Sequence, residues 1–148
     1  MELRTILIAD DDPNDIELTL EALKDNNLAN QLIVVKDGVE ALEYLNRKGK
    51  YSDHKPGNPC VILLDIKMPR MDGIEVLRNI RSDPYLRRIP VVILSSSREE
   101  QDLINAYDLG VNAYAVKPID FQKFLVAVKQ IGSFWAVINE LPPDSMTN

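Results

Sequence analysis

Short apolar runs alternate along this chain with longer segments in which apolar residues recur three and four positions apart. Within each short run nearly every residue is apolar, as in residues 60–64, which is typical of a strand covered on both faces. The longer segments indicate amphipathic helices, as in residues 13–26, where Ile16, Leu20 and Leu23 share one face. The predicted strands are 5–9, 31–36, 60–64, 90–94 and 113–116, and the predicted helices are 13–26, 38–46, 73–82, 98–109 and 121–139.

Five strands that alternate with five helices predict an α/β fold: a parallel sheet that is doubly wound, with helices on both faces. Residues 47–59 are rich in Pro, Gly and polar side chains and predict a long loop before the third strand. We expect a single domain over residues 1–140, followed by a frayed tail over residues 141–148, where two prolines stand together.

Composition narrows the class of protein. The 148 residues are 45% hydrophobic and 27% charged, which suits one globular domain with a proper core. Lys and Arg total 17 against 23 Asp and Glu, a net charge of −6, so neither nucleic acid nor an anionic membrane is an expected partner. Cys60 and His54 are each single, which excludes a disulfide framework and a Cys/His zinc site. Without a run of about 20 apolar residues or a secretory signal, we expect a cytoplasmic protein.

Polar side chains capable of chemistry follow four of the five predicted strands. They are Asp10, Asp11 and Asp12 after the first strand, Asp65 after the third, Ser95 to Ser97 after the fourth and Lys117 after the fifth. Ligands of open parallel sheets bind beyond the carboxyl ends of the strands. The sequence therefore predicts that carboxylates, a hydroxyl and an ammonium meet at one edge of the sheet.

The chemistry of this set favours a phosphoryl group carried on an aspartate. Clustered carboxylates raise one another's pKa unless a cation lies among them, and oxygen ligands in a solvated site suit Mg²⁺. Lys117 offers a compact positive charge to a phosphoryl oxygen, and Ser95 offers a hydroxyl donor. Phosphoryl transfer through a loose transition state needs mainly such positioning and charge neutralisation.

Each of these residues also has a simpler explanation. A single Asp after a strand is most often a helix N-cap or a turn residue, and we assign Asp12 to that role. A single Ser after a strand is usually a turn former. The phosphoryl site is favoured because four strand ends bring the required groups to the same edge in one alternating pattern.

Four segments carry a resemblance to a known family: Ala9-Asp10-Asp11-Asp12, the run from Leu64-Asp65 through Pro69 to Asp72-Gly73, Leu94-Ser95-Ser96, and Lys117-Pro118. In this order and spacing they resemble the receiver domains of two-component response regulators, which are CheY-like. The resemblance covers about residues 3–131 and implies a flavodoxin-like sheet with strand order 2-1-3-4-5. It also implies a phosphoacceptor signalling protein that catalyses its own phosphorylation and slow dephosphorylation but turns over no external metabolite.

The resemblance assigns a role to each matching residue. It makes Asp65 the phosphoacceptor, with Mg²⁺ bound by Asp10, Asp11, Asp65 and the backbone carbonyl of Lys67. Ser95 becomes the hydroxyl that moves onto the phosphoryl group, Lys117 its charged partner and Tyr114 the aromatic switch. Pro69 and Gly73 shape the loop after Asp65. Ser96 stands where a smaller residue is common in the family, and Lys67 and Ser97 flank the phosphoryl site at positions that tune its hydrolysis.

Within the family, the chain resembles stand-alone regulators of the cyanobacterial-phytochrome type. The long loop before the third strand, Ser133-Phe134-Trp135 and Leu141-Pro142 carry this likeness. It implies a sensor histidine kinase of the phytochrome-like class as one partner. With no room for a DNA-binding module, we expect an unidentified downstream protein as the other.

The last predicted helix offers a candidate partner face. Phe134, Val137 and Ile138 lie beside its core stripe, and Tyr114 comes from the neighbouring strand. Two interpretations stay open: these residues extend the core of their own domain, or they form a homodimer contact or docking patch.

Two other functions compete with this prediction. An aspartate-nucleophile phosphatase of the haloacid-dehalogenase type requires a second Asp two residues after its nucleophile, but Lys67 stands there. A receiver-like interaction module that works without phosphate is the alternative, although no residue that phosphorylation needs is missing.

Overall fold

The computed structural model describes residues 4–25, 30–53, 57–117 and 121–135. The strands are β1 (Arg4–Ala9), β2 (Asn30–Val35), β3 (Val61–Leu64), β4 (Val91–Ser95) and β5 (Ala113–Val116). The helices are α1 (Pro13–Asp25), α2 (Gly38–Asn46), α3 (Gly73–Ser82), α4 (Glu100–Asp108) and α5 (Phe121–Ser133), with a short 3₁₀ helix, η1, at Gly49–Tyr51. All pairs of neighbouring strands are parallel and the strand order is β2-β1-β3-β4-β5, as predicted.

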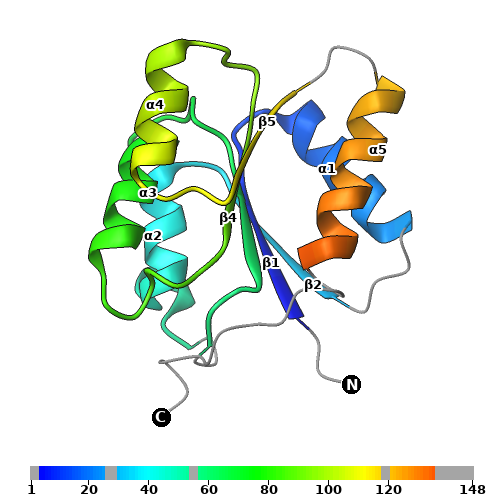
Figure 1. Cartoon of the computed structure of the whole chain (residues 1–148). Coiled ribbons are helices and arrows are strands. Elements are labelled where there is room, and N and C mark those ends of the chain that lie inside the picture. Colours follow the sequence, from blue (N-terminus) through cyan, green and yellow to red (C-terminus); the bar gives the residue numbers. More distant parts are fainter. Residues whose placement is uncertain (1–3, 26–29, 54–56, 118–120, 136–148) are drawn as a thin grey trace.

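The sheet lies between two layers of helices. Helices α1 and α5 cover one face, and α2, α3 and α4 cover the other (Figure 1). Alternate residues of each strand enter the two cores: Leu7 and Ile62 face α2–α4, whereas Ile8 and Leu63 face α1 and α5. This double coverage explains why the strand sequences are apolar at every position rather than at every second one.

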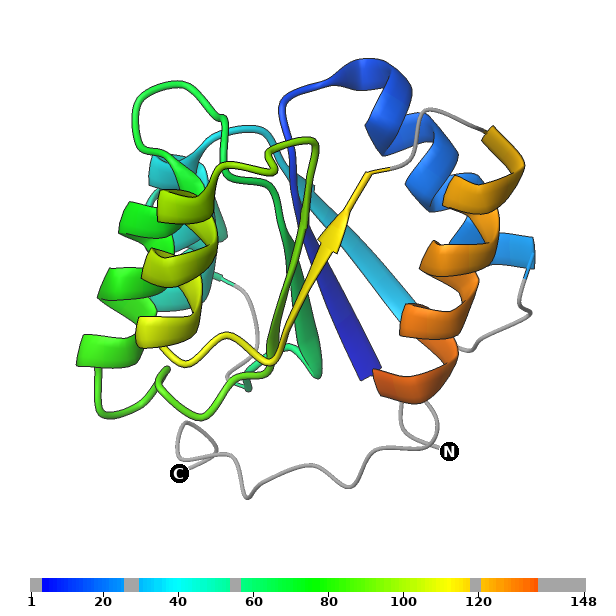
Figure 2. The same cartoon turned by 45° about the horizontal axis from the view of Figure 1, so that its top comes forward.

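The strands end, and the helices begin, at one common edge of the sheet (Figure 2). Three aspartates cap helices there, each accepting a hydrogen bond from a backbone N–H of the first turn. Asp12 caps α1, as predicted, by accepting from the N–H groups of Asn14 and Asp15 at 2.9 and 3.3 Å. Asp37 caps α2 and Asp72 caps α3 in the same way. Local capping therefore fixes the helix ends that surround the site.

The predicted boundaries lie within one residue of those in the structure, apart from the start of α4 and the end of α5. Helix α4 begins at Glu100 rather than at residue 98, because the Ser97 hydroxyl accepts from the N–H of Glu99 and donates to the carboxylate of Asp102, which keeps the preceding residues in a loop. The predicted helix over 121–139 is described only to Ser133, with Phe134 and Trp135 after it, and its remainder lies outside the described residues.

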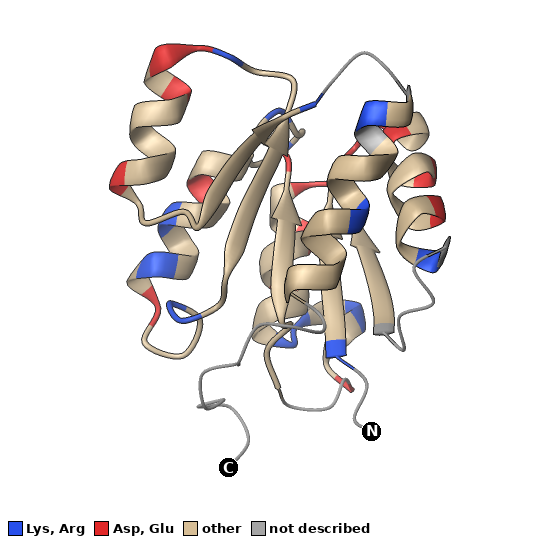
Figure 3. Ribbon diagram, turned by 45° about the vertical axis from the view of Figure 1, so that its right-hand side comes forward, with Lys and Arg blue, Asp and Glu red and all other residues tan. Residues whose placement is uncertain are grey.

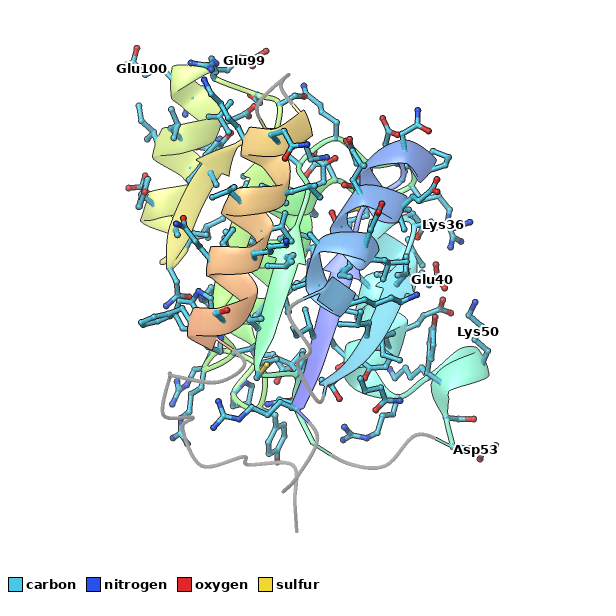
Figure 4. The ribbon with its side chains drawn as sticks, turned by 90° about the vertical axis from the view of Figure 1, so that its right-hand side faces the viewer. Lys36, Glu40, Lys50, Asp53, Glu99 and Glu100 are labelled. Carbon is cyan, nitrogen blue, oxygen red and sulfur yellow. The ribbon has the colours of Figure 1, made fainter. Side chains whose placement is uncertain are left out.

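The predicted loop over residues 47–59 contains the 3₁₀ helix η1, which was not predicted. Its Tyr51 is buried, and its ring contacts the ring of Tyr44 edge to face with centroids 5.2 Å apart. The hydroxyl of Tyr51 donates to the carboxylate of Glu40 at 2.7 Å, and Lys50 pairs with the same carboxylate at 2.9 Å. Figure 4 shows Glu40 on α2 beside Lys50 on η1. These contacts fasten the first part of the loop to α2.

A second set of contacts joins two loops at the edge of the sheet away from the capped helix N-termini. Arg81, near the end of α3, is half-buried and donates to four backbone carbonyls, those of Leu109, Arg87, Ile89 and Gly110, at 2.9 to 3.0 Å. One side chain thus joins the loop after α3 to the loop after α4.

Candidate functional site

Three strands deliver charged side chains to one point at the carboxyl edge of the sheet. Asp10 follows β1, Asp65 follows the adjacent β3, and Lys117 follows β5. The Nζ atom of Lys117 lies 2.8 Å from Oδ2 of Asp10 and 3.1 Å from Oδ2 of Asp65. All three side chains are at least nine-tenths buried. The structure therefore brings together the residues that the strand ends predicted.

A fourth member of this cluster was not predicted. Oδ2 of Asp15, in the first turn of α1, also lies 2.8 Å from Nζ of Lys117. Asp15 does not directly follow a strand, so the rule of strand ends assigns it no functional role. The sequence signal that could have indicated Asp15 is the N-cap at Asp12, because the cap fixes where the first turn of α1 begins and so which of its side chains face the sheet.

Three carboxylates form a candidate metal site. One oxygen each of Asp10, Asp11 and Asp65 lies within 4.8 Å of the others. Asp11 is exposed and the other two are buried, so the cluster opens to solvent on one side. An oxygen-only donor set with room for water fits a hard divalent cation such as Mg²⁺ or Mn²⁺. The side chain of Lys67 is exposed, and the metal-binding role of its carbonyl stays a prediction.

The electrostatics of the cluster show an excess of negative charge. Burial raises the pKa of Asp10 to about 6, against the lowering effect of its hydrogen bonds from Lys117 and the N–H of Asp12. For Lys117, burial alone lowers the pKa, but the bonds to Asp10 and Asp15 outweigh it and raise the pKa above its ordinary value. Both shifts describe a pocket that retains protons and cations.

The backbone around Asp65 is tightly held. Its Oδ1 accepts the N–H of Ile66 at 2.7 Å, which leaves Oδ2 directed at Lys117. The N–H of Gly73, the first residue of α3, donates to the carbonyl of Ile66 at 2.8 Å. The predicted shaping role of Gly73 therefore has a physical basis, since the start of α3 packs directly on the residues around Asp65.

The outer part of the loop after Asp65 is tied to the start of α2. Arg70, which has a positive φ of 65°, donates from its guanidinium to both carboxylate oxygens of Asp37 at 3.0 to 3.1 Å. Gly38 packs on Met71 so closely that a Cβ atom there would lie 2.1 Å from the Met71 carbonyl oxygen. Asp37 thus caps a helix and anchors the loop at once.

Ser95 and Tyr114 lie on the other side of the cluster. Ser95 is fully buried, and its carbonyl accepts the backbone N–H of Lys117 at 2.7 Å, which places the two predicted residues side by side. Its hydroxyl accepts the N–H of Ser97 at 3.2 Å. The Tyr114 hydroxyl donates to the carbonyl of Ser97 at 3.0 Å, and Ser97 donates to Asp102 of α4 at 2.6 Å. Ser97 therefore connects Ser95, Tyr114 and α4.

The predicted partner face is only partly described. Phe134 is 46% exposed, and its ring meets that of Trp135 edge to face at 5.0 Å. Tyr114 is half-buried, and Val137 and Ile138 lie outside the described residues. Exposed apolar side chains also occur on α4, at Ile104 and Tyr107, and on α5, at Val126. Among the described helices, none has the length and apolar character needed to cross a bilayer.

The fold and the site together define an α/β protein of the CheY-like class, with its functional groups at the carboxyl edge of the sheet. The chain belongs to the response regulator receiver domain family, whose model matches residues 6–129. It is a receiver-domain response regulator, a phosphoacceptor signalling protein.

The similar proteins include several regulators linked to phytochromes. Response regulator Rcp1 of Synechocystis sp. is 39% identical over 139 residues, which cover 94% of this chain and 93% of Rcp1. The crystal structure of its Mn²⁺-bound form has a TM-score of 0.88 at 38% identity and covers 95% of this chain and 99% of that one. The phosphorylated cyanobacterial phytochrome response regulator RcpA has a TM-score of 0.90 at 40% identity, with 96% and 100% covered.

A bacteriophytochrome response regulator, RtBRR, is 53% identical, with a TM-score of 0.77 and 97% and 87% of the two chains covered. The predicted likeness to phytochrome-type regulators is confirmed.

Proposed function

We propose that Asp65 accepts a phosphoryl group from a histidine of a sensor kinase, in a reaction that depends on Mg²⁺. The observation that carries this proposal is the position of the Lys117 ammonium between Asp10 and Asp65, at 2.8 and 3.1 Å, beside a trio of carboxylates suited to a cation. An aspartyl phosphate needs positive charge beside its phosphoryl oxygens. A fixed ammonium on one side of the buried carboxylate and a site for a hard metal ion on the other would supply it.

The chemistry follows from the arrangement of the chain's own groups. Oδ2 of Asp65 attacks the phosphorus in line, the P–N bond of the phosphohistidine breaks, and the imidazole leaves with the bonding electrons and takes up a proton. Lys117 and the hydroxyl of Ser95 hold two of the phosphoryl oxygens. The carboxylates of Asp10, Asp11 and Asp65, with the carbonyl of Lys67, would hold Mg²⁺, which neutralises charge on the phosphoryl oxygens.

The bound phosphoryl group is lost by slow attack of water, so the protein turns over no external metabolite. Lys67 is exposed and Ser97 is half-buried, and we infer that these two residues, which flank the phosphoryl site, tune this loss. The same groups that stabilise transfer to Asp65 also stabilise the attack of water on the acyl phosphate, which makes the phosphorylated form transient.

Phosphorylation changes the face built from α4, β5 and α5. The new group adds roughly two negative charges, and Ser95 turns its hydroxyl toward them and away from the N–H of Ser97. Because Ser97 also holds Tyr114 and Asp102, its release alters the ring of Tyr114 and the first turn of α4 together. A partner protein reads that change.

The relatives indicate the class of kinase. RcpA is described as a cyanobacterial phytochrome response regulator and RtBRR as a bacteriophytochrome one. We infer a phytochrome-like sensor histidine kinase as the donor for this chain. The face that carries Tyr114, Phe134 and Val137 pairs two copies of the chain or docks a downstream protein.

The proposal is tested with acetyl phosphate, which labels receiver aspartates without a kinase. We expect Mg²⁺-dependent incorporation of one phosphoryl group, lost with EDTA and lost in Asp65→Asn. Glu17→Gln, an exposed charge change on α1, serves as the matched control and is labelled normally. No label on the intact, folded protein would leave the phosphate-independent interaction module as its function.

A further inference from the structure

The Lys117 ammonium makes three charge-assisted hydrogen bonds, which equals the number of its N–H donors. Two acceptors are Asp10 and Asp65, and the third is Asp15 at 2.8 Å. Asp15 differs from the other two in its origin, because it comes from α1 and not from a strand end. It also stands outside the carboxylate trio that can hold a metal. Asp15 is therefore the one acceptor of the three that neither binds the cation nor receives the phosphoryl group.

The backbone of Asp15 is fixed without help from its side chain. Its N–H donates to the N-cap carboxylate of Asp12 at 3.3 Å, and its carbonyl accepts the hydroxyl of Thr19, which is buried, at 2.7 Å. The carboxylate is then free to turn to the sheet rather than back to the helix end. Figure 3 shows α1 carrying several acidic residues, and of these only Asp15 is bonded to Lys117 within the part of the chain that the structure describes.

Cation binding and phosphorylation alter the other two acceptors of Lys117 and leave Asp15 unchanged. A cation bound by the carboxylate trio would offset the negative charge of Asp10. Phosphorylation converts the Asp65 oxygen that faces Lys117 into part of an acyl phosphate. The carboxylate of Asp15 takes part in neither event. It can hold one N–H of the ammonium so that another N–H points to the phosphoryl oxygen.

The geometry points to Asp15 as a positioning residue, one that anchors the Lys117 ammonium beside Asp65 and so sets the rate of phosphoryl transfer. The inference rests on the proposed function of Asp65 and deepens it. The anchor must be charged and must reach Nζ, so a longer carboxylate retains part of the effect and an apolar side chain retains none.

The test compares Asp15→Ala, Asp15→Glu and the control Glu17→Gln, a loss of charge on the same helix away from Lys117. The first measurement is the rate of labelling by acetyl phosphate at saturating Mg²⁺, so that altered metal affinity does not enter. We expect a loss of about tenfold in Asp15→Ala, a smaller loss in Asp15→Glu and wild-type labelling in the control. The second measurement is the ¹H–¹⁵N signal of the Lys117 ammonium, assigned by its absence in Lys117→Arg. This signal is visible only when the ammonium is held.

The two measurements separate the inference from the proposed function. If wild-type protein takes up no label, the proposed function fails whatever Asp15 does, and the ammonium signal still reports whether Asp15 anchors Lys117. If wild-type protein is labelled, and Asp15→Ala keeps both the labelling rate and the ammonium signal, the inference is overturned. A slower rate together with a lost signal, both recovered in part by Asp15→Glu, supports it.

Discussion

Gly73 lies against the backbone of Asp65: a Cβ atom on Gly73 would be 2.1 Å from the Asp65 carbonyl oxygen and 2.9 Å from its carbonyl carbon. Neither atom belongs to a flexible side chain, so the contact cannot be relieved by a rotamer change. The start of α3 therefore sets the position of the residue at the centre of the site.

We expect Gly73→Ala to lower the free energy of unfolding by about 2 kcal/mol or more, because the added methyl group must push α3 away from Asp65. The same displacement moves the carboxylate relative to Lys117 and slows labelling by acetyl phosphate. Urea unfolding and the labelling rate measure the two effects. Asn79→Ala, on the exposed side of the same helix, is the control. A variant as stable and as readily labelled as wild type would show that the contact is not restrictive.

Removing the charge of Asp10 is expected to stabilise the metal-free protein. Burial raises its pKa from 3.8 to about 6, so the folded state binds more protons than the unfolded state between these values, and stability falls as pH rises through that window. At pH 7 in EDTA, Asp10→Asn should raise the free energy of unfolding by about 1–2 kcal/mol, and at pH 3.5 the difference should vanish.

Mg²⁺ should reverse this order at pH 7. It stabilises wild-type protein, by about 2.7 kcal/mol at a hundred times its dissociation constant, and does little for Asp10→Asn. Urea unfolding with EDTA or with Mg²⁺ gives both comparisons, and Glu17→Gln again serves as the control. A metal-free Asp10→Asn protein that is less stable than wild type at pH 7 would contradict the electrostatic account.

Glu40 is expected to contribute stability with the opposite pH dependence. Burial alone raises its pKa, but the bonds from Lys50, from Tyr51 and from the N–H of Lys36 outweigh it and lower the pKa to about 2. The contribution is therefore complete above the ordinary pKa of 4.5 and is lost as pH falls toward 2.

At pH 7, Glu40→Gln should cost about 1–2 kcal/mol of unfolding free energy, and the cost should shrink at pH 2.5. Chemical denaturation at the two pH values measures it. Lys36→Ala is the control, because it keeps the backbone N–H that donates to Glu40 while removing a side chain that Figure 4 shows on the surface. A pH-independent loss would mean that Glu40 acts by packing and not by charge.

Arg81→Ala is expected to cost about 2–3 kcal/mol, because the four backbone carbonyls that its guanidinium bonds would lose a charged donor at once. Arg81→Lys should recover little, since a lysine cannot reach carbonyls of two loops in the planar geometry of a guanidinium. Thermal unfolding measures the loss. Arg78→Ala removes an exposed ion pair with Glu75 and should change stability by less than about 0.5 kcal/mol. Equal losses of stability in Arg78→Ala and Arg81→Ala would show that the bonds from Arg81 to the carbonyls contribute no more than an exposed ion pair.

The partner face leads to a prediction about assembly. If two copies pair through the face that carries Tyr114 and Phe134, beryllofluoride with Mg²⁺, which mimics the phosphoryl group, should shift the protein from monomer to dimer in light scattering. Phe134→Ser should weaken that shift, because the ring is exposed in the isolated chain. An unchanged mass with and without beryllofluoride would favour docking of a different protein.

The residues that follow the strands could be located from the sequence, because a parallel sheet places every strand end on one edge. This rule places Asp10, Asp65, Ser95 and Lys117 together. It does not predict the position of Asp15, because Asp15 lies in a helix and not at a strand end. Its contact depends on the rotation of a helical turn and on where a long lysine side chain ends. Arg81 was missed for a related reason, since four of its acceptors are backbone carbonyls, which carry no sequence signal.

The loop over residues 47–59 shows the limit of composition as a guide. Its Gly, Pro and polar residues predict an irregular segment, and yet Tyr51 turns inward to Glu40 and forms η1. A single tyrosine can order a turn when its ring packs on another aromatic ring and its hydroxyl binds a carboxylate, even if the flanking residues favour an irregular loop.

The cluster around Lys117 joins residues that are far apart in the chain, since Asp10 and Asp65 follow the first and third strands, Asp15 lies in α1 and the lysine follows the fifth strand. During synthesis, Asp10, Asp15 and Asp65 emerge from the ribosome well before Lys117, whose ammonium pairs with them in the folded protein. A sheet formed from the first four strands alone would therefore carry these carboxylates without the ammonium that pairs with them. The last strand of the sheet and the positive charge at its carboxyl edge are thus added together, late in the synthesis of this molecule.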